Sequence, residues 1–196
     1  MENTTSTEQS RNYRNFELKA TRITDFELAL VPGLAQTPEY AYETLSALRV
    51  GDREEDIEAW VGLRMSRQAI LARKHPPELH WILTELNLRQ PIGGGKIMSR
   101  QVQHLAELAE RPNITVNVIP ATVAAHAGLE GQFVIMEFAV DPTVVYVEDK
   151  TTGLFLDDDA KVARYRLTVE KLTDVTLDAK ASLRMLRSIA TDLGRE

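Results

Sequence analysis

The chain has 196 residues, a formal net charge of −6 and a sequence pI of about 5.3. Apolar residues make up 43% of the chain and charged residues 27%, a composition typical of a globular protein with a buried core. Because binding to nucleic acid depends on Lys and Arg displacing counterions, the acidic charge disfavours direct contact with DNA or RNA. There is no cysteine, which excludes disulfides and thiolate metal sites.

The N-terminal segment is polar. It lacks the apolar core of a secretory signal, and no apolar run in the chain approaches the roughly 20 residues needed to cross a bilayer. We therefore expect a cytoplasmic protein that contacts no membrane. The first residues show no apolar period, which predicts a disordered leader over 1–12 and a single domain over 13–196.

The first half of the domain is predicted to be helical. Residues 13–30 carry apolar side chains at steps of three and four, which indicates one amphipathic helix that ends before Pro32. A second helix is expected to begin at Thr37, a suitable N-cap, with Pro38 at the first helical position. Residues 54–73 resume the helical period.

The centre of the chain changes to patterns typical of strands. Residues 79–84 alternate with period two, although 82–89 could also bend into a turn or a short helix. Ser99 is a candidate cap for a helix that follows a glycine loop. Further strands are predicted at short β-rich runs, namely 114–118, 133–138, 144–147 and, as an edge, 153–156.

Two helices are predicted at the C-terminal end, over 162–172 and, after a cap at Asp178, over 183–193. The order is helices, then strands with one crossover helix, then helices. This order predicts an α+β (mixed α/β) domain, with a small central sheet of about four to five strands flanked by amphipathic helices.

Three candidate motifs lack residues that their chemistry requires. Residues 93–96, Gly-Gly-Gly-Lys, would need glycine at Gln90 and Ser or Thr at Ile97 to form a phosphate loop. The acidic run 157–159 lacks the later glycine and glutamate of a calcium loop, and the histidines show no metal-binding spacing. We expect no bound metal and no cofactor.

Polar residues that interrupt apolar segments are the candidates for a binding site. Gly128 and Gly131 bracket a loop that leads into the most apolar predicted strand, at 133–138, and such loops often bind ligands. A tight structural turn would also account for these two glycines. The arginines could also be solvated helix residues, and the carboxylates could lie at edges or in local ion pairs. We predict that these side chains line one pocket or docking face on the sheet: Arg64, Arg67, Gln68, Glu85, Arg89, His126, Gly128, Phe133 and Glu148.

Short motifs spread over residues 13–193 also stand in a recognisable order. They are Val31-Pro32-Gly33-Leu34-Ala35-Gln36-Thr37 with Tyr40-Ala41, Arg64-x-x-Arg67-Gln68-x-x-Leu71, Glu85-x-x-Leu88-Arg89, Gln101-x-x-His104-Leu105, Val116-x-Val118-Ile119-Pro120, Gly128-x-x-Gly131-x-Phe133 and Val145-Tyr146-Val147-Glu148. Together they resemble an actinobacterial domain of unknown function that usually follows an Xre-type helix-turn-helix in transcription regulators. The resemblance implies a non-DNA-binding sensory or partner-binding module that binds a small molecule or a small protein partner, and it supplies no catalytic residue.

Two questions stay open at this stage. The helix-turn-helix itself does not match this sequence, which fits either a fragment of a longer protein or a natural stand-alone homologue. The alternative function is an enzyme of a small-molecule biosynthetic pathway that uses Glu85, His126 or Glu148 as acid or base in the same pocket. An exposed apolar helix face would support a homodimer.

Overall fold

A six-stranded sheet forms the centre of the fold, in the order β3-β2-β1-β4-β5-β6. The computed structural model describes residues 3–150 and 152–195, with side chains from residue 10 onward in those ranges. The strands are β1 (Arg22–Glu27), β2 (Glu78–Thr84), β3 (Ile114–Ile119), β4 (Phe133–Glu137), β5 (Val144–Glu148) and β6 (Gly153–Leu156). The first three strands are parallel, and β4, β5 and β6 continue the sheet in antiparallel pairs from β1.

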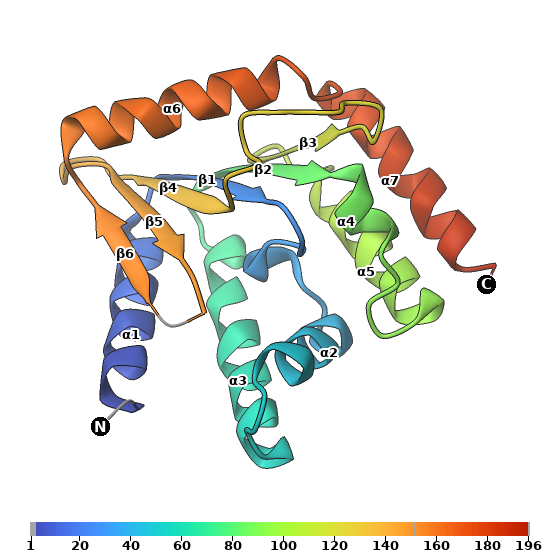
Figure 1. Cartoon of the computed structure of the whole chain (residues 1–196), viewed down its shortest axis with the longest axis horizontal. Helices are drawn as coiled ribbons and strands as arrows, with labels where there is room; N and C mark the ends of the chain where they lie inside the picture. Colours follow the sequence, from blue (N-terminus) through green and yellow to red (C-terminus); the bar gives the residue numbers. More distant parts are fainter. Residues whose placement is uncertain (1–2, 151, 196) are drawn as a thin grey trace.

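Helices cover both faces of this sheet unequally. They are α1 (Asn3–Lys19), α2 (Pro38–Leu48), α3 (Glu54–Arg67), α4 (Glu85–Arg89), α5 (Gly95–Leu108), α6 (Asp159–Thr173) and α7 (Ala179–Leu193), with 3-10 turns η1 (Gly33–Ala35) and η2 (Gln68–Ala72). Figure 1 shows α6 along one face and α1, α3 and α5 beneath the other, with α7 beside α5. None of the helices in the described ranges has the length and apolarity that a membrane crossing requires.

The core is divided by the sheet into two clusters. The larger includes side chains of α1, α2, η2, α5 and α7 and contains Ile23 of β1 and Trp81 of β2. The smaller lies under α6 and contains Phe26 of β1 and Phe133 of β4. Strand β1 therefore contributes to both clusters, and its alternate residues point to opposite sides of the sheet.

The α+β class is confirmed, but the sheet has six strands rather than four to five. The additional strand is β1, which the predicted helix over 13–30 concealed. Helix α1 ends at Lys19, and the chain then pairs with β2 on one side and β4 on the other. Residues 23–26 are all buried, so β1 shows no polar alternation, and Ile23 and Phe26 happen to fall at a helical spacing. The expectation of a single helix over 13–30 was wrong for this reason.

The other helix boundaries mostly follow the sequence. Thr37 caps α2 by accepting a hydrogen bond from the backbone of Tyr40, and Asp178 caps α7. Ser99 does not cap α5, because that helix begins at Gly95, and the Ser99 hydroxyl donates instead to the carbonyl of Ala190 at 2.7 Å. Helix α1 begins at Asn3, where a disordered leader over 1–12 was expected; residues 1–2 lie outside the described residues.

Candidate ligand-binding site

The predicted site residues do not converge on one pocket. Glu85 and Arg89 form a local pair on α4, with Arg89 Nε donating to Glu85 Oε1 at 2.7 Å. The backbone N–H of Ala121 donates to the other Glu85 oxygen at 2.9 Å. This backbone bond, together with Arg89, lowers the pKa of Glu85. The pair thus ties α4 to the segment after β3 and leaves Glu85 a stable carboxylate.

His126 and Gly128 build a tight turn under α6. The Gly128 N–H donates to Nδ1 of His126 at 3.2 Å, and burial lowers the pKa of His126. A side chain at Gly128 would meet the ring of Phe26, because an added Cβ would lie 2.3 Å from that ring. Packing against Phe26 therefore requires glycine at this position, in agreement with a tight structural turn.

The remaining arginines belong to a group of ionisable residues around β1, here called the polar cluster. Glu17 and Asp25 are its buried members, Glu27, Arg64 and Arg67 are partly buried, and Glu148 is exposed. Within it, Arg67 and Glu17 form a closed pair. Nε and Nη2 of Arg67 donate to the two Glu17 oxygens at 2.9 and 2.7 Å. The side chain of Glu17 is 2% exposed and that of Arg67 19%, and the guanidinium also lies 4.9 Å from the ring of Tyr13. Removing one partner would leave a buried charge uncompensated.

Asp25 is the least satisfied member of the polar cluster. It is 8% exposed, and its Oδ1 accepts no hydrogen bond from any part of the chain that the structure describes. Trp81 lies directly opposite Asp25 on β2, and its buried indole N–H also has no hydrogen-bond partner among the described residues. Burial raises the pKa of Asp25 to about 7, with Arg67 opposing and Glu17 adding to the rise. A buried polar group without a partner costs about 1–3 kcal/mol.

Glu27 and Arg64 face each other in the polar cluster without a tight ion pair. Burial raises the pKa of Glu27, the carboxylates of Asp25 and Glu148 raise it further, and Arg64 opposes them. Arg64 donates to the side chain of Gln36 at 2.8 Å, and among the described side chains no carboxylate lies within 4.0 Å of it. Burial, together with the neighbouring Arg67, lowers the pKa of Arg64 to about 10.

The third predicted helix residue, Gln68, supports this arrangement from the side. Its amide donates to the backbone carbonyl of Gln36 at 2.6 Å, so Gln68 and Arg64 both hold the segment that follows η1. Gln68 therefore orients a neighbour of the polar cluster and is not itself one of the charged groups.

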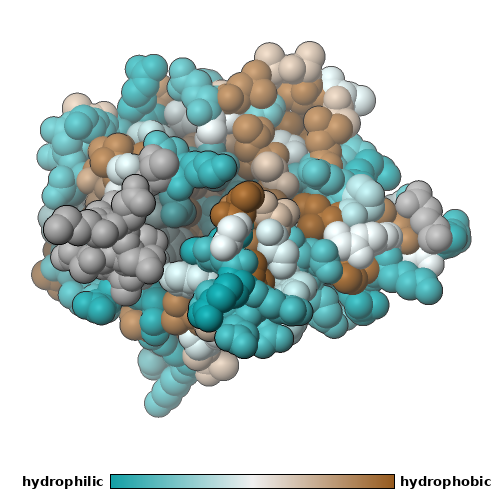
Figure 2. All heavy atoms as spheres, turned by 60° about the horizontal axis from the view of Figure 1, so that its bottom comes forward, coloured by the Kyte–Doolittle hydropathy of each residue, from teal (hydrophilic) through white to brown (hydrophobic). Residues whose placement is uncertain are grey.

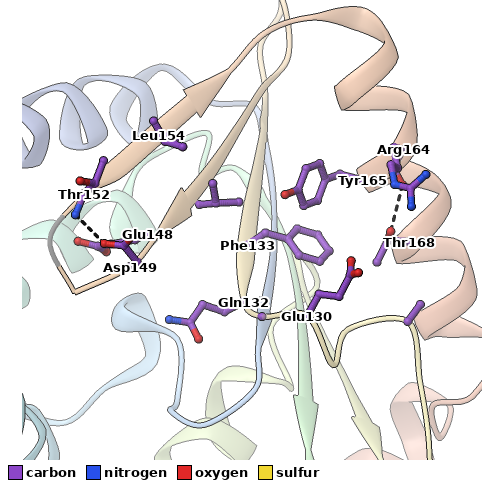
Figure 3. Close-up of a pocket in the computed structure, with 13 residues that line it drawn as sticks. Glu130, Gln132, Phe133, Glu148, Asp149, Thr152, Leu154, Arg164, Tyr165 and Thr168 are labelled. Carbon is purple, nitrogen blue, oxygen red and sulfur yellow. Dashed lines mark hydrogen bonds between the residues drawn. The ribbon is translucent and has the colours of Figure 1, made fainter.

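A pocket of about 350 Å³, here called the edge pocket, opens where β4 begins and β5 ends, near α6. Figure 3 shows Phe133 and Tyr165 facing each other across the space between β4 and α6, with a ring-centroid distance of 4.9 Å. Glu130 points into the same space, whereas Gln132 lies on the other side of β4. The full lining is Ala127, Glu130, Gly131, Gln132, Phe133, Val147, Glu148, Asp149, Thr152, Leu154, Arg164, Tyr165 and Thr168.

The register of the sheet joins the edge pocket to the polar cluster. On β1 and β4, Phe26 pairs with Phe133, so the next residue, Glu27, lies opposite Gln132. On β4 and β5, Val134 pairs with Tyr146, and two residues farther along Gln132 lies opposite Glu148. Because side chains alternate along a strand, these three polar residues share the face of the sheet that carries the polar cluster. Glu148 therefore lies in both places, and the candidate site is the edge pocket together with the polar cluster behind it.

Two of the nine predicted residues, Phe133 and Glu148, line the edge pocket, and Arg64 and Arg67 lie in the polar cluster. The sequence reasoning missed Asp25 and Glu27, because β1 was read as part of a helix. Two carboxylates spaced two apart in the segment Ile-Thr-Asp-Phe-Glu, which also carries two large apolar residues and a β-branched threonine, were the signal that could have revealed them.

Comparison with known proteins supplies a family but no activity. No curated protein matches the chain. A family model described as Domain of unknown function (DUF5753) matches residues 10–188, a span that contains every residue of the candidate site. The chain belongs to the DUF5753 family.

Proposed function

We propose that this domain is a small-molecule-binding module whose ligand occupies the edge pocket. The observation that carries the proposal is Asp25, a nearly buried carboxylate with an unpartnered oxygen and a pKa raised to about 7, in the polar cluster that reaches the pocket through Glu148. Ionisable groups with perturbed pKa values beside a concave pocket are typical of functional sites.

The shape of the site favours a small molecule over a protein partner. A pocket of about 350 Å³ lies in the size range of ligand sites, and Phe133 and Tyr165 give it an aromatic wall. Figure 2 shows that hydrophilic residues cover much of the face turned forward and that hydrophobic residues lie between them in small groups. A protein interface would favour a larger continuous apolar patch.

The resemblance to domains that follow an Xre-type helix-turn-helix supports a sensory role for this binding. In that arrangement a ligand changes the state of a regulator by binding one conformation of the sensory domain more tightly than another. The net charge of −6 and the carboxylates of the candidate site also support a role in which this domain does not itself contact DNA.

Native mass spectrometry of the protein purified from its own host tests the proposal. Thr168→Trp would fill the edge pocket from α6, whereas Leu167→Trp places the same side chain at a neighbouring position outside the pocket lining, where leucine is already 53% exposed. We expect a bound small molecule on the wild-type protein and on Leu167→Trp, and its loss from Thr168→Trp. Retention of the same molecule by folded Thr168→Trp would place the binding elsewhere.

The enzymatic alternative is favoured by a different observation. The raised pKa of Glu27 is the property that a general acid requires near neutral pH. If the domain is an enzyme, Glu27→Gln should abolish turnover of the bound molecule while the molecule still binds. Equal turnover by Glu27→Gln and wild type would exclude Glu27 as the acid.

A further inference from the structure

We propose that the ligand of the edge pocket is a zwitterion, an amino acid whose carboxylate binds Arg164 and whose ammonium group binds Glu130. Its apolar side chain lies against the aromatic wall of the pocket. This inference rests on the proposed function and specifies the chemical class of its ligand. The family match and the pocket dimensions leave that class open, so the argument comes from the charged groups on the α6 side of the pocket.

The α6 side of the edge pocket combines an aromatic wall with two charges of opposite sign. Phe133 of β4 contacts Tyr165 of α6, and Figure 3 shows the carboxylate of Glu130 pointing toward α6, on the side where Arg164 and Thr168 lie. Arg164 and Thr168 are four residues apart within α6, so their side chains project from the same side of the helix. The carboxylate therefore comes from the loop before β4 and the guanidinium from the helix that faces it.

The side chains of Glu130 and Arg164 are both available to a ligand. Neither forms an ion pair or a side-chain hydrogen bond with any residue that the structure describes, and the two do not approach each other within 4.0 Å. The other acidic residues of the lining are less suitable on this side. Glu148 lies on the opposite face of the sheet from Phe133, and Oδ1 of Asp149 accepts the backbone N–H of Thr152 at 2.8 Å.

The loop that carries Glu130 has a defined backbone conformation. The N–H of Leu129 donates to the carbonyl of His126 at 3.3 Å, and the N–H of Gly131 donates to that of Gly128 at 3.1 Å. Two turns therefore follow one another directly before β4. Gly131 has a φ of +135°, a conformation that glycine adopts readily and other residues rarely do. Glu130 is thus held at a fixed point of the pocket rim.

Helix α6 holds Arg164 in an equally defined place. Val162 and Leu172 are 5% and 0% exposed and anchor the helix on the smaller core cluster. Tyr165, the residue next to Arg164, packs edge-to-face against Phe133 with ring centroids 4.9 Å apart. Because the groups on both walls are carried by ordered elements, a ligand that bridges them loses less free energy in ordering the protein.

A zwitterion matches both walls at once. The guanidinium presents a planar fork of N–H donors that fits a carboxylate, and a carboxylate accepts hydrogen bonds from an ammonium group. A ligand with a single charge would satisfy one of the two side chains and repel or leave unpaired the other. In an α-amino acid the two groups are attached to one carbon, so a small molecule can reach Glu130 and Arg164 together. A pocket of about 350 Å³ also has room for its side chain against Phe133 and Tyr165.

A set of probes separates the two charges: L-phenylalanine, 3-phenylpropionate, which lacks the ammonium group, and 2-phenylethylammonium, which lacks the carboxylate. Each is titrated into the full chain by isothermal calorimetry at about pH 7.5, where both groups of the amino acid are charged. L-Leucine is titrated as a second amino acid. We expect at least one of the two amino acids to bind with a millimolar Kd, and L-phenylalanine to bind at least about tenfold more tightly than either of its single-charge analogues.

Two variants should have complementary effects on these probes. Glu130→Gln should weaken L-phenylalanine and 2-phenylethylammonium about fivefold and leave 3-phenylpropionate unchanged. Arg164→Gln should weaken L-phenylalanine and 3-phenylpropionate about fivefold and leave 2-phenylethylammonium unchanged. The matched controls are Glu170→Gln and Arg184→Gln, which remove exposed charges outside the pocket lining and should bind every probe as the wild type does.

Several results would overturn the inference. Absence of binding by both amino acids at about 10 mM would reject the ligand class. Equal affinity for L-phenylalanine and its single-charge analogues, or unchanged affinity for it in both Glu130→Gln and Arg164→Gln, would remove the proposed contacts. The native mass spectrum distinguishes this failure from failure of the proposed function. A molecule that is lost from Thr168→Trp but lacks an amine or a carboxylate would refute the zwitterion alone, whereas one that folded Thr168→Trp retains would refute the pocket itself.

Discussion

Replacing Asp25 with asparagine should change the pH dependence of folding, because Asp25 is the carboxylate with the clearest desolvation cost. In the folded protein, burial and Glu17 raise its pKa from 3.8 to about 7 against the opposing effect of Arg67. In the unfolded chain the carboxyl is hydrated and its pKa returns to about 4. The folded state therefore binds the Asp25 proton more tightly than the unfolded state does.

The sign and size of the effect follow from this difference. Between pH 4 and pH 7 the unfolded chain has lost the proton while the folded chain retains it, so the free energy of unfolding falls as the pH rises. Each pH unit corresponds to about 1.4 kcal/mol, so the interval between 3.8 and about 7 corresponds to about 4 kcal/mol. Below pH 4 and above pH 7 this contribution is constant.

Asparagine resembles the protonated carboxyl in shape and cannot ionise. Asp25→Asn should therefore gain stability relative to the wild type as the pH rises from 4 to 8, by about 4 kcal/mol in total, whatever constant cost the amide itself adds. Urea unfolding at several pH values, followed by circular dichroism, measures this difference. Asp141→Asn, a change at an exposed carboxylate between β4 and β5, is the control. Parallel stability profiles for the wild type and Asp25→Asn would refute the reasoning.

Three further variants test the surroundings of the site and of the fold. Arg67→Met should lower the free energy of unfolding by about 3–5 kcal/mol, because Glu17 would be left charged and buried, and the double change with Glu17→Leu should recover part of the loss; additive losses in urea unfolding would contradict the pairing. Gly128→Ala should destabilise by about 1–3 kcal/mol because the new methyl would overlap a packed ring, whereas Gly62→Ala, in open space within α3, should stabilise by about 0.5–1 kcal/mol; equal melting temperatures for the two variants would be inconsistent with the packing. Asp178→Ala should cost about 1 kcal/mol by removing the cap of α7, and a variant that unfolds at the wild-type urea concentration would show that the cap contributes nothing.

The strands and helices that the sequence predicted well are those with a local pattern. The first residues of β2 alternate between polar and apolar, because the face that carries His80 is only partly covered. Strands β4 and β5 are recognisable as short runs of β-branched and aromatic residues. The caps at Thr37 and Asp178 were readable because capping depends on one side chain and the backbone a few residues ahead.

Strand β1 was not readable in the same way. It is buried on both faces in the middle of the sheet, and its pairing partners lie more than fifty residues away in β2 and more than a hundred away in β4. Both the location of the strand and its neighbours are therefore set by tertiary pairing, which a local period does not contain.

The candidate site was only partly predictable for a related reason. Phe133 and Glu148 were chosen because polar residues and glycines adjoin apolar strands, and both line the edge pocket. Glu85 and His126 were chosen because they adjoin apolar segments, and in the structure each has local partners that explain its position. Asp25 became significant only once β1 was placed, because its lack of a hydrogen-bond partner is a property of the packed fold.

The most direct test of the central claim is a ¹H–¹⁵N correlation spectrum of the labelled protein during titration with the small molecule that native mass spectrometry identifies on the protein from its own host. The account predicts that the largest amide shifts map to Gln132, Phe133 and Glu148 at the edge pocket, and that these shifts disappear in Thr168→Trp. Shifts concentrated instead on the shallow surface between α5 and α7, around His104, or persisting unchanged in Thr168→Trp, would contradict it.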